Sequence, residues 1–371
     1  ILPAQKRQDS LPILYVRGSY YDVGYNVGRT FCGLIKTLIE THPSLNNEYL
    51  PIYETPEGKE IYDRTYQCVN KYYPHYMREL QGLSDGSNIP FYKLFLLHLD
   101  DVLPASVNQR NQNGCQGCSS VCLNEPHNEI LGHTEDAFKE VLNNIFILNA
   151  HITESEPEEK FTAFCYAGLL PGYAMGFNNY GLIYSVNIIG AKYLGAGKLP
   201  RAFVARKLLT ADSLESALKI LRCKGSGIAD AMSINLTFLN QAGDRLFHNI
   251  EVSPTYPISN ESALSVLTIS PGEVIFHANK FLRLQLPECE GPLVDSSNDR
   301  HKTRENHILT DSKSVNELLG DMTHSRHTVF RNSGMINTVA VGIFNCNART
   351  WSIYMDNPKT SDPIVVLSLD Y

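Results

Sequence analysis

A glycine–cysteine bond followed by two hydroxyl residues offers the most specific chemistry in this chain. The residues are Gly117-Cys118-Ser119-Ser120, and the strand-like run Val121-Cys122-Leu123 continues them. Glycine has no Cβ and tolerates strained backbone angles, so the peptide bond before Cys118 is open to attack by the cysteine's own sulfur. Cleavage there would make Cys118 a new N-terminus. Its α-amino group, which titrates near ~7.7–8.0, would then accept the thiol proton without help from a histidine.

A second Gly-Cys bond, Gly114-Cys115, competes for the same role. The loop continues after Cys115, whereas a strand follows Cys118. A nucleophile needs a rigid strand end to hold its sulfur in an attacking position, so the sequence favours Cys118. The two cysteines also read as a lone C-x-x-C pair, but a redox dithiol normally begins a helix. The plain alternative is a glycine-rich turn that carries two cysteines.

The composition is that of an ordinary globular protein and argues against several classes of function. The 371 residues are 43% hydrophobic and 19% charged, with a net charge of −7. No block rich in Lys and Arg marks a nucleic-acid binder, and no apolar run approaches the ~18 residues of a membrane span. The nine cysteines show no paired zinc spacing, so we expect neither a metal nor another cofactor. No secretory leader is visible, which favours a cytoplasmic protein, although processing could have removed a leader before Ile1.

Residues 1–117 are predicted to be mainly helical. A short strand at 12–17 precedes helical spacing over 20–41, 60–83 and 90–102. Residues 105–117 are polar and nearly featureless, so we expect a flexible, solvent-reachable linker that leads directly into Cys118. A helical segment joined by such a linker to a strand-rich remainder fits a precursor that is cut at the end of the linker.

Residues 118–371 show strand patterns separated by turns, with helices grouped between them. Helices are expected at 199–209, 213–223, 298–310 and 312–322. Strands are expected at 119–124, 129–134, 145–151, 161–167, 174–178, 182–188, 233–239, 245–252, 265–269, 274–278, 337–344 and 350–355. This arrangement suggests an α+β layered sandwich.

The motifs after the nucleophile fall in the order of one known family. They are Gly132-His133-Thr134-Glu135-Asp136-Ala137, the Asn178-to-Leu182 turn, His277-Ala278-Asn279 and Ser297-x-x-Arg300. With them the chain resembles the acyl-coenzyme A:6-aminopenicillanic acid acyltransferase family of N-terminal nucleophile hydrolases, distant relatives of the bile-salt hydrolases. The similarity spans nearly the whole chain. It implies a four-layer αββα sandwich, self-cleavage into associated fragments 1–117 and 118–371, and amide hydrolysis through an acyl-cysteine.

The resemblance also implies roles for individual residues. Cys118 would be the nucleophile, and Asp136 would hydrogen-bond the ammonium created by cleavage. Asn279 would donate its amide N–H to the tetrahedral oxyanion, an interaction worth ~2.7–4 kcal/mol in comparable sites. Arg300 looks like the family's site arginine, which would keep the thiolate anionic by proximity, with Arg304 as the alternative. A strand-end Asn or Asp with a purely structural role remains an alternative for each polar residue.

Two further positions bear on the electrostatics and contacts of the site. Asn187 is a candidate for a hydrogen bond to the amine or carbonyl side of the substrate, or for a structural role. Bile-salt hydrolases carry arginine where this chain has His133, so the charge around the nucleophile differs from theirs.

Within the family, the chain looks most like members that hydrolyse β-alanyl amines, with β-alanyl-dopamine as the expected substrate and β-alanyl-histamine as a further one. Binding of the cationic acyl group is expected to require a carboxylate in the pocket, and the candidates are Glu135, Glu251 and Asp295. The aromatic amine asks for aromatic walls, and the candidates are Tyr166, Tyr173 and Phe177.

Three other interpretations stay open from the sequence. The first is an acyltransferase, in which an amine rather than water resolves the acyl-enzyme, because both reactions need the same residues. A non-catalytic binding protein on the same fold would be expected to lack Cys118 or Asn279, and both are present. A papain-like dyad of cysteine with His133 or His277 lacks the local signature of that family.

Overall fold

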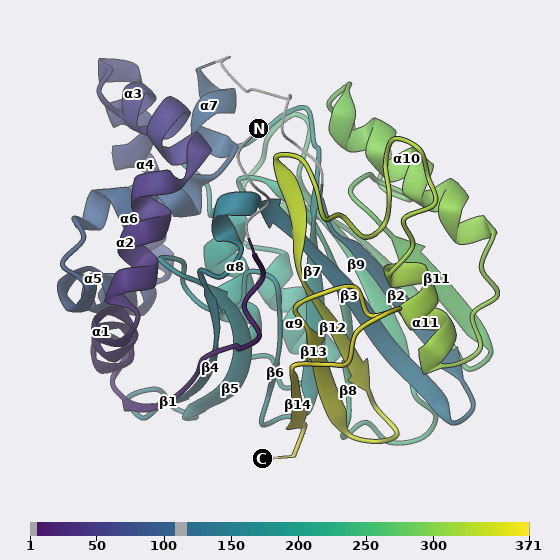
Figure 1. Ribbon diagram of the computed structural model, residues 1–371. Coiled ribbons are helices and arrows are strands. Elements are labelled where there is room, and N and C mark those ends of the chain that lie inside the picture. Colours follow the sequence, from purple (N-terminus) through teal and green to yellow (C-terminus); the bar gives the residue numbers. More distant parts are fainter. Residues whose placement is uncertain (1–5, 108–116, 371) are drawn as a thin grey trace.

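Two β-sheets pack face to face, with helices on the outer side of each, in the computed structural model, which describes residues 6–107 and 117–370 (Figure 1). Within these residues, the first sheet has eight strands in the order β1 (Ile13–Gly18), β4 (Ile145–Ile152), β5 (Glu159–Tyr166), β6 (Met175–Asn178), β7 (Leu182–Ile189), β8 (Ala231–Phe238), β9 (Phe247–Pro254) and β10 (Ser262–Ile269). The second has six, in the order β11 (Glu273–His277), β2 (Ser119–Glu125), β3 (Asn128–Phe138), β12 (Ile336–Asn345), β13 (Thr350–Tyr354) and β14 (Val365–Ser368).

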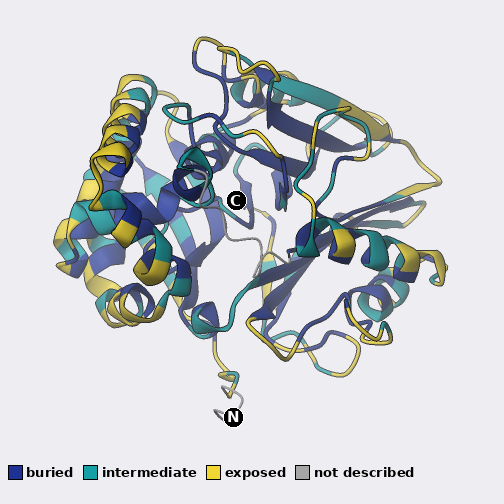
Figure 2. Ribbon diagram, turned by 90° about the horizontal axis from the view of Figure 1, so that it is seen from above, coloured by how far each residue is buried: buried dark blue, intermediate teal, exposed yellow. Residues whose placement is uncertain are grey.

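The helices divide between the two outer faces. On the outer side of the eight-stranded sheet lie α1 (Tyr20–Thr30), α2 (Cys32–Thr41), a π-helical turn (Leu45–Tyr49), α3 (Leu50–Tyr53), α4 (Pro56–Tyr72), α5 (Pro74–Ser87), α6 (Phe91–Leu99), α7 (Val102–Ser106), α8 (Arg201–Leu208) and α9 (Leu214–Leu221). Against the six-stranded sheet lie α10 (Pro292–Glu305) and α11 (Ser312–Leu319). A short 3₁₀ turn covers Lys139–Val141. Figure 2 shows the sheets buried and the outer helix faces exposed. The expected αββα sandwich is confirmed.

The N-terminal segment shares its core with the rest of the chain. Strand β1 pairs in parallel with β4, so the first sheet needs a strand from this segment. Helices α1 and α5 cross closely, because a Cβ on Gly24 would come within 1.9 Å of a backbone oxygen of α5. The buried Arg206 on α8 binds both Glu79 on α5 and Glu159 on β5 at 2.9–3.0 Å. These contacts would hold the two fragments together if the chain were cut.

The β2–β3 hairpin positions Cys118, the expected nucleophile. Ser119 pairs with Thr134 and Ser120 with His133, so Cys118, one residue before β2, faces Glu135 and Asp136. On its other side β2 pairs with β11, whose last residue is His277. The residues around Cys118, Asp136 and His277 therefore come from neighbouring strands of the six-stranded sheet.

Most expected elements exist, with shifted ends. The predicted helix at 60–83 is two helices, because Pro74 cannot continue α4 and Tyr73 leaves the helical region. The helix predicted at 298–310 begins earlier, at Pro292, and the short β14 was not expected. Residues 108–116, which hold most of the predicted linker and Cys115, lie outside the described residues.

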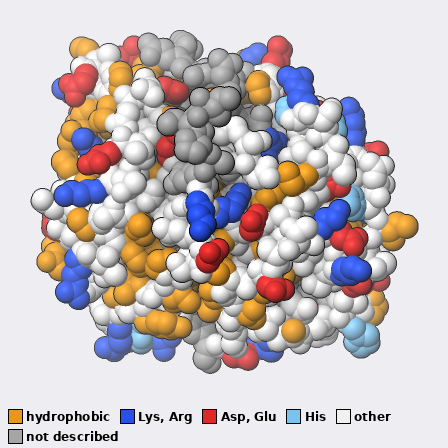
Figure 3. All heavy atoms as spheres, in the orientation of Figure 1, with side chains coloured by type: hydrophobic (Ala, Val, Ile, Leu, Met, Phe, Trp, Pro, Cys, Tyr) orange, Lys and Arg blue, Asp and Glu red, His pale blue; other side chains and the backbone are white. Residues whose placement is uncertain are grey.

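The charge distribution on the surface and the polarity of the helices are those expected from the composition. On the described residues of the face in Figure 3, acidic and basic side chains are interspersed. No helix within residues 6–107 and 117–370 has the length and apolar character needed to cross a bilayer.

Candidate active site

A cavity of about 300 Å³ lies between the N-terminal helices and the start of the β2–β3 hairpin, with Cys118 in its wall. One side comes from α2, the π-helical turn and the end of α6. The other side comes from β3, β5 and the loops that follow β5 and precede β12. Among the described lining residues are five carboxylates and several aromatic side chains, but no lysine or arginine: Glu48, Asp100, Asp101, Glu135, Asp136, Tyr49, Phe138, Tyr166 and Tyr173.

The Cys118 thiol is buried and touches two groups from β3. Its sulfur lies 3.3 Å from Glu135 Oε2 and accepts from the backbone N–H of Asp136 at 3.4 Å. Burial, together with the nearby charges of Glu135 and Asp136, raises the pKa of this thiol well above its usual value. In the uncut chain the thiol is therefore protonated at neutral pH, and it needs a base in contact with it to react.

Asn279 lies directly against the glycine of the expected cleavage site. A Cβ built on Gly117 would fall 2.4 Å from Asn279 Nδ2, so only glycine fits there without a shift. The same Nδ2 donates to the backbone oxygen of Ile188 at 2.8 Å, and Oδ1 accepts from Arg300 at 2.6 Å. The side chain is thus held rigidly next to the Gly117–Cys118 bond.

Arg300 is fully buried and binds the backbone of Cys118 rather than its sulfur. Its Nη1 donates to the carbonyl oxygen of Cys118 at 2.7 Å and to Ser119 Oγ at 2.8 Å. Burial, reinforced by the nearby Arg331, lowers the pKa of Arg300 to about 9. The expected proximity to Cys118 is observed, but the contacts point to positioning of the residue. Arg304, the alternative, instead donates to the carbonyl of His307.

Asp136 is held by a residue that the sequence reasoning missed. Its Oδ2 lies 3.3 Å from Nε of Arg331, and its Oδ1 accepts from Thr338 at 2.6 Å. Burial raises the pKa of Asp136, although Arg331 and Arg300 act in the opposite direction. Arg331 stands in a loop before β12 with no motif around it, so only the three-dimensional arrangement reveals it.

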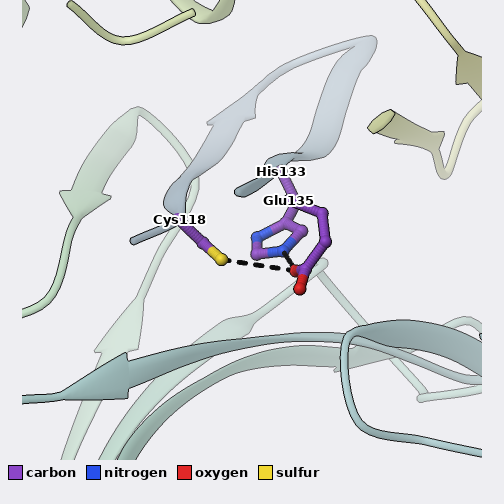
Figure 4. A group of neighbouring side chains, drawn as sticks. All are labelled: Cys118, His133 and Glu135. Carbon is purple, nitrogen blue, oxygen red and sulfur yellow. Dashed lines mark hydrogen bonds and ion pairs between the residues drawn. The ribbon is translucent and has the colours of Figure 1, made fainter. Parts of the chain in front are cut away.

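Glu135 and His133 form a hydrogen-bonded group with the thiol, as Figure 4 shows. His133 Nε2 lies 2.7 Å from Glu135 Oε2, and Tyr166 donates its hydroxyl to Glu135 Oε1 in a short hydrogen bond. The sulfur, an imidazole nitrogen and a carboxylate oxygen of this trio lie within 4.8 Å of one another, which also describes a possible set of metal ligands. Because 2.7 Å is a direct hydrogen-bond distance, we assign the group to proton sharing. That the protein uses no metal stays a prediction.

Four of the expected substrate contacts lie elsewhere. Asn187 is buried between the sheets, where it accepts from Ser120 and Asn235, and it does not line the cavity. Phe177 packs edge-on against Trp351 between the sheets. Asp295 is exposed on α10. The sequence does not distinguish an inward-facing polar or aromatic residue that lines a cavity from one that packs against the opposite sheet.

Glu251 is the fourth of these residues, and it has a structural role here. Its carboxylate accepts from the backbone N–H groups of Leu282, Arg283 and Leu284 at 2.6–3.1 Å. It also lies 3.1 Å from His277 Nε2. The candidate carboxylate for a cationic substrate is therefore not Glu251.

The N-terminal helices supply acidic groups that the sequence reasoning did not single out. Glu48, Asp100 and Asp101 line the cavity opposite Cys118. Asp100 accepts from the hydroxyl of Tyr173 at 2.8 Å and forms a close ion pair with Arg201. Tyr173 in turn packs edge-on against Tyr166, at 5.9 Å between ring centroids. In the sequence, the adjacent pair Asp100-Asp101 just before the linker is a signal that could have indicated an acidic site.

Comparisons with known proteins place the chain in a family. The profile of the acyl-coenzyme A:6-aminopenicillanic acid acyl-transferase family matches residues 123–360. A beta-alanyl-dopamine/carcinine hydrolase of Drosophila melanogaster is 39% identical over 386 aligned residues, which cover 100% of this chain and 98% of the relative.

Two solved structures of conjugated bile acid hydrolase from Clostridium perfringens, each with a single substitution, are more distant. One has 12% identity to this chain and a TM-score of 0.36, and the other has 13% identity and a TM-score of 0.34. Each match covers 68% of this chain and 97% of the solved one. On the profile match and the full-length relative, this chain belongs to the acyl-coenzyme A:6-aminopenicillanic acid acyl-transferase family.

Proposed function

We propose that this protein is a cysteine amidohydrolase that cuts its own chain before Cys118 and then hydrolyses β-alanyl amines, β-alanyl-dopamine first among them, to β-alanine and the free amine. The main support for this proposal is the cavity. Its wall contains Cys118 and five carboxylates, and no lysine or arginine is among its described lining residues. The name of the full-length relative supports the same substrates, as a beta-alanyl-dopamine/carcinine hydrolase.

The acidic lining suits a cationic acyl group. A β-alanyl amide carries an ammonium three bonds from the carbonyl carbon, so the ammonium stays within a few ångströms of the reacting atom. Hydrogen bonds between charged groups contribute roughly 1.5–3 kcal/mol each where water is excluded. Glu135, Glu48 and Asp101 are the carboxylates we assign to this interaction, because all three line the cavity that holds Cys118.

The aromatic lining suits the amine part of the substrate. Tyr49, Tyr166, Tyr173 and Phe138 line the cavity, and a catechol ring would pack against such side chains. Burial raises the pKa of both Tyr166 and Tyr173, so these phenols stay neutral and act as hydrogen-bond donors.

Turnover would use the amino group that self-cleavage creates. The α-amino group of Cys118 takes the thiol proton, the sulfur attacks the amide carbonyl, and the C–N bond breaks as the leaving amine receives that proton. The acyl group stays on sulfur as a thioester. Water then attacks the thioester, which releases β-alanine and restores the thiol. Arg300 and Asn279 would keep the nucleophile and the carbonyl aligned.

The test is a comparison of three dopamine amides with the purified, cleaved enzyme. The β-alanyl amide should be hydrolysed with a kcat/KM at least roughly tenfold above that of the propionyl and N-acetyl-β-alanyl amides, because only it carries the ammonium. Equal rates would mean that the acidic lining does not recognise the acyl group. Product analysis with an added acceptor amine separates hydrolysis from acyl transfer.

A further inference from the structure

A chain of buried hydrogen bonds between the sheets ends at the nucleophile. It starts at a guanidinium, passes through three asparagine side chains and a serine, and reaches the His133–Glu135 pair. The successive partners are Arg283 to Asn249 (2.6 Å), Asn249 to Asn235 (2.7 Å), Asn235 to Asn187 (3.0 Å), Ser120 to Asn187 (2.7 Å), Ser120 to His133 Nδ1 (2.8 Å) and His133 Nε2 to Glu135 (2.7 Å).

Arg283, at the start of this series of hydrogen bonds, determines which atom of each pair carries the hydrogen. A guanidinium only donates, so it orients the amide of Asn249 with its oxygen toward Arg283. The same orientation passes to Asn235 and then to Asn187, whose Nδ2 meets the carbonyl oxygen of His277 at 3.4 Å. The oxygen of Asn187 therefore faces Ser120, and the single hydroxyl hydrogen of Ser120 must point to it.

One proton must therefore lie between the side chains of His133 and Glu135. Since the Ser120 hydrogen is used on Asn187, the Nδ1 of His133 must carry a hydrogen and donate to Ser120 Oγ. Two bare acceptors would repel at 2.7 Å, so a second proton lies between His133 Nε2 and Glu135 Oε2. With that proton on nitrogen, the pair is an imidazolium and a carboxylate, and the carboxylate oxygen facing Cys118 is a base.

The uncut chain needs such a base. Before cleavage, the nitrogen of Cys118 is an amide, which cannot take the thiol proton as the amino group would afterwards. We propose that the Glu135 carboxylate, held by His133 and Tyr166, accepts the Cys118 thiol proton during self-cleavage. This inference rests on the self-cleavage in the proposed function, and it assigns Glu135 to maturation in addition to its place in the cavity wall.

Self-cleavage by this route needs no reactant other than water, which enters in the second stage. Glu135 takes the proton from sulfur, and the sulfur attacks the carbonyl carbon of Gly117. The Gly117–Cys118 C–N bond breaks as Glu135 returns the proton to the leaving nitrogen, which leaves a thioester between Gly117 and the sulfur. Water hydrolyses the thioester, so Gly117 becomes a free carboxylate and the thiol is restored.

Several groups face Glu135 from the elements packed around it. Cys118 stands before β2, His133 and Asp136 share strand β3 with Glu135, and Tyr166 comes from β5. The charge of Asp136 is countered by Arg331. His133 and Tyr166 act as positioning residues, because they touch the base and not the sulfur.

The experiment follows cleavage of the full-length chain, made by cell-free translation, at a series of pH values from about 5 to about 9. Intact mass gives the rate of conversion to the two fragments. Wild type should cleave at a rate that changes little from neutral to alkaline pH, because the carboxylate that takes the thiol proton is already in contact with the sulfur. Glu135→Gln should cleave roughly 10²–10⁴-fold more slowly at neutral pH. Its rate should rise by about tenfold per pH unit as the thiol ionises unaided.

Two further variants control for folding. Glu135→Asp keeps the carboxylate and should cleave at an intermediate rate with a plateau. Glu125→Gln, at the far end of the same hairpin, should behave as wild type. A wild-type rate without a plateau, or a Glu135→Gln rate equal to wild type, overturns the role of Glu135 while self-cleavage stands. Activity of a wild-type chain that never cleaves overturns the proposed function instead.

Discussion

The amide of Asn279 occupies the space where a side chain on Gly117 would begin, with Nδ2 only 2.4 Å from an ideal Cβ. The glycine requirement at the expected cleavage site is therefore steric. It ties the residue before the scissile bond to the residue proposed to stabilise its transition state.

Gly117→Ala should slow maturation. The added methyl group displaces either Asn279 or the Gly117 carbonyl, and misplacement of this size costs roughly 10²-fold in rate. The measurement is the rate of conversion to two fragments by intact mass. Gly33→Ala is the matched control, because a Cβ there meets nothing within 4 Å. Cleavage of Gly117→Ala at the wild-type rate would contradict the steric argument.

Asn279→Ala should lower kcat by roughly 10²–10³-fold with little change in KM, because a lost oxyanion donor acts mainly in the transition state. The variant also removes the partner of Arg300 Nη2, so cleavage should slow as well. Steady-state kinetics on the cleaved fraction, with thermal unfolding as the check on folding, decide the matter. An effect confined to KM would mean that Asn279 binds the ground state.

The double variant Glu48→Gln, Asp101→Asn should reduce the preference for β-alanyl over propionyl amides by roughly ten- to hundredfold, since it removes two carboxylates from the cavity wall. Propionyl hydrolysis should change far less. Asp295→Asn is the control, because Asp295 is exposed on α10 and should leave the preference unaltered. A preference unchanged in the double variant would mean that neither Glu48 nor Asp101 recognises the ammonium.

Glu251→Gln should destabilise the fold in a pH-dependent manner. Burial opposes ionisation of Glu251, but hydrogen bonds from His277 and from the amides of Leu284 and Leu282 outweigh it and lower its pKa to about 2. Because this folded-state pKa lies below the usual 4.5, the stabilisation is present above about pH 4.5 and is lost as the pH falls toward 2.

Urea unfolding measures this effect. At neutral pH the variant should lose up to about 3 kcal/mol, and the difference from wild type should shrink below about pH 4.5. Glu305→Gln, an exposed substitution at the end of α10, should change stability little. A difference that does not depend on pH would mean that the charge of Glu251 is not what stabilises the loop.

The layered fold and the nucleophile hairpin could be predicted because their signals are local. Alternation of apolar residues marks the strands, and the Cys118 and Asp136 motifs lie on adjacent strands joined by a short turn. The break at Pro74 was also readable, since proline ends or kinks a helix.

The rest of the site depends on contacts between distant segments. Arg331 reaches Asp136 from a loop, and Glu48 and Asp101 reach the cavity from the N-terminal helices. The roles of Asn187 and Glu251 depend on what the inward face of a strand meets, which a single sequence does not reveal.

Intact mass and N-terminal sequencing of the purified, active protein test the central claim most directly. The account predicts two chains that stay together, the second of them beginning at Cys118, and a full-length, inactive chain for Cys118→Ala. Full activity in an uncut chain, or a second chain that begins at Cys115, would contradict it.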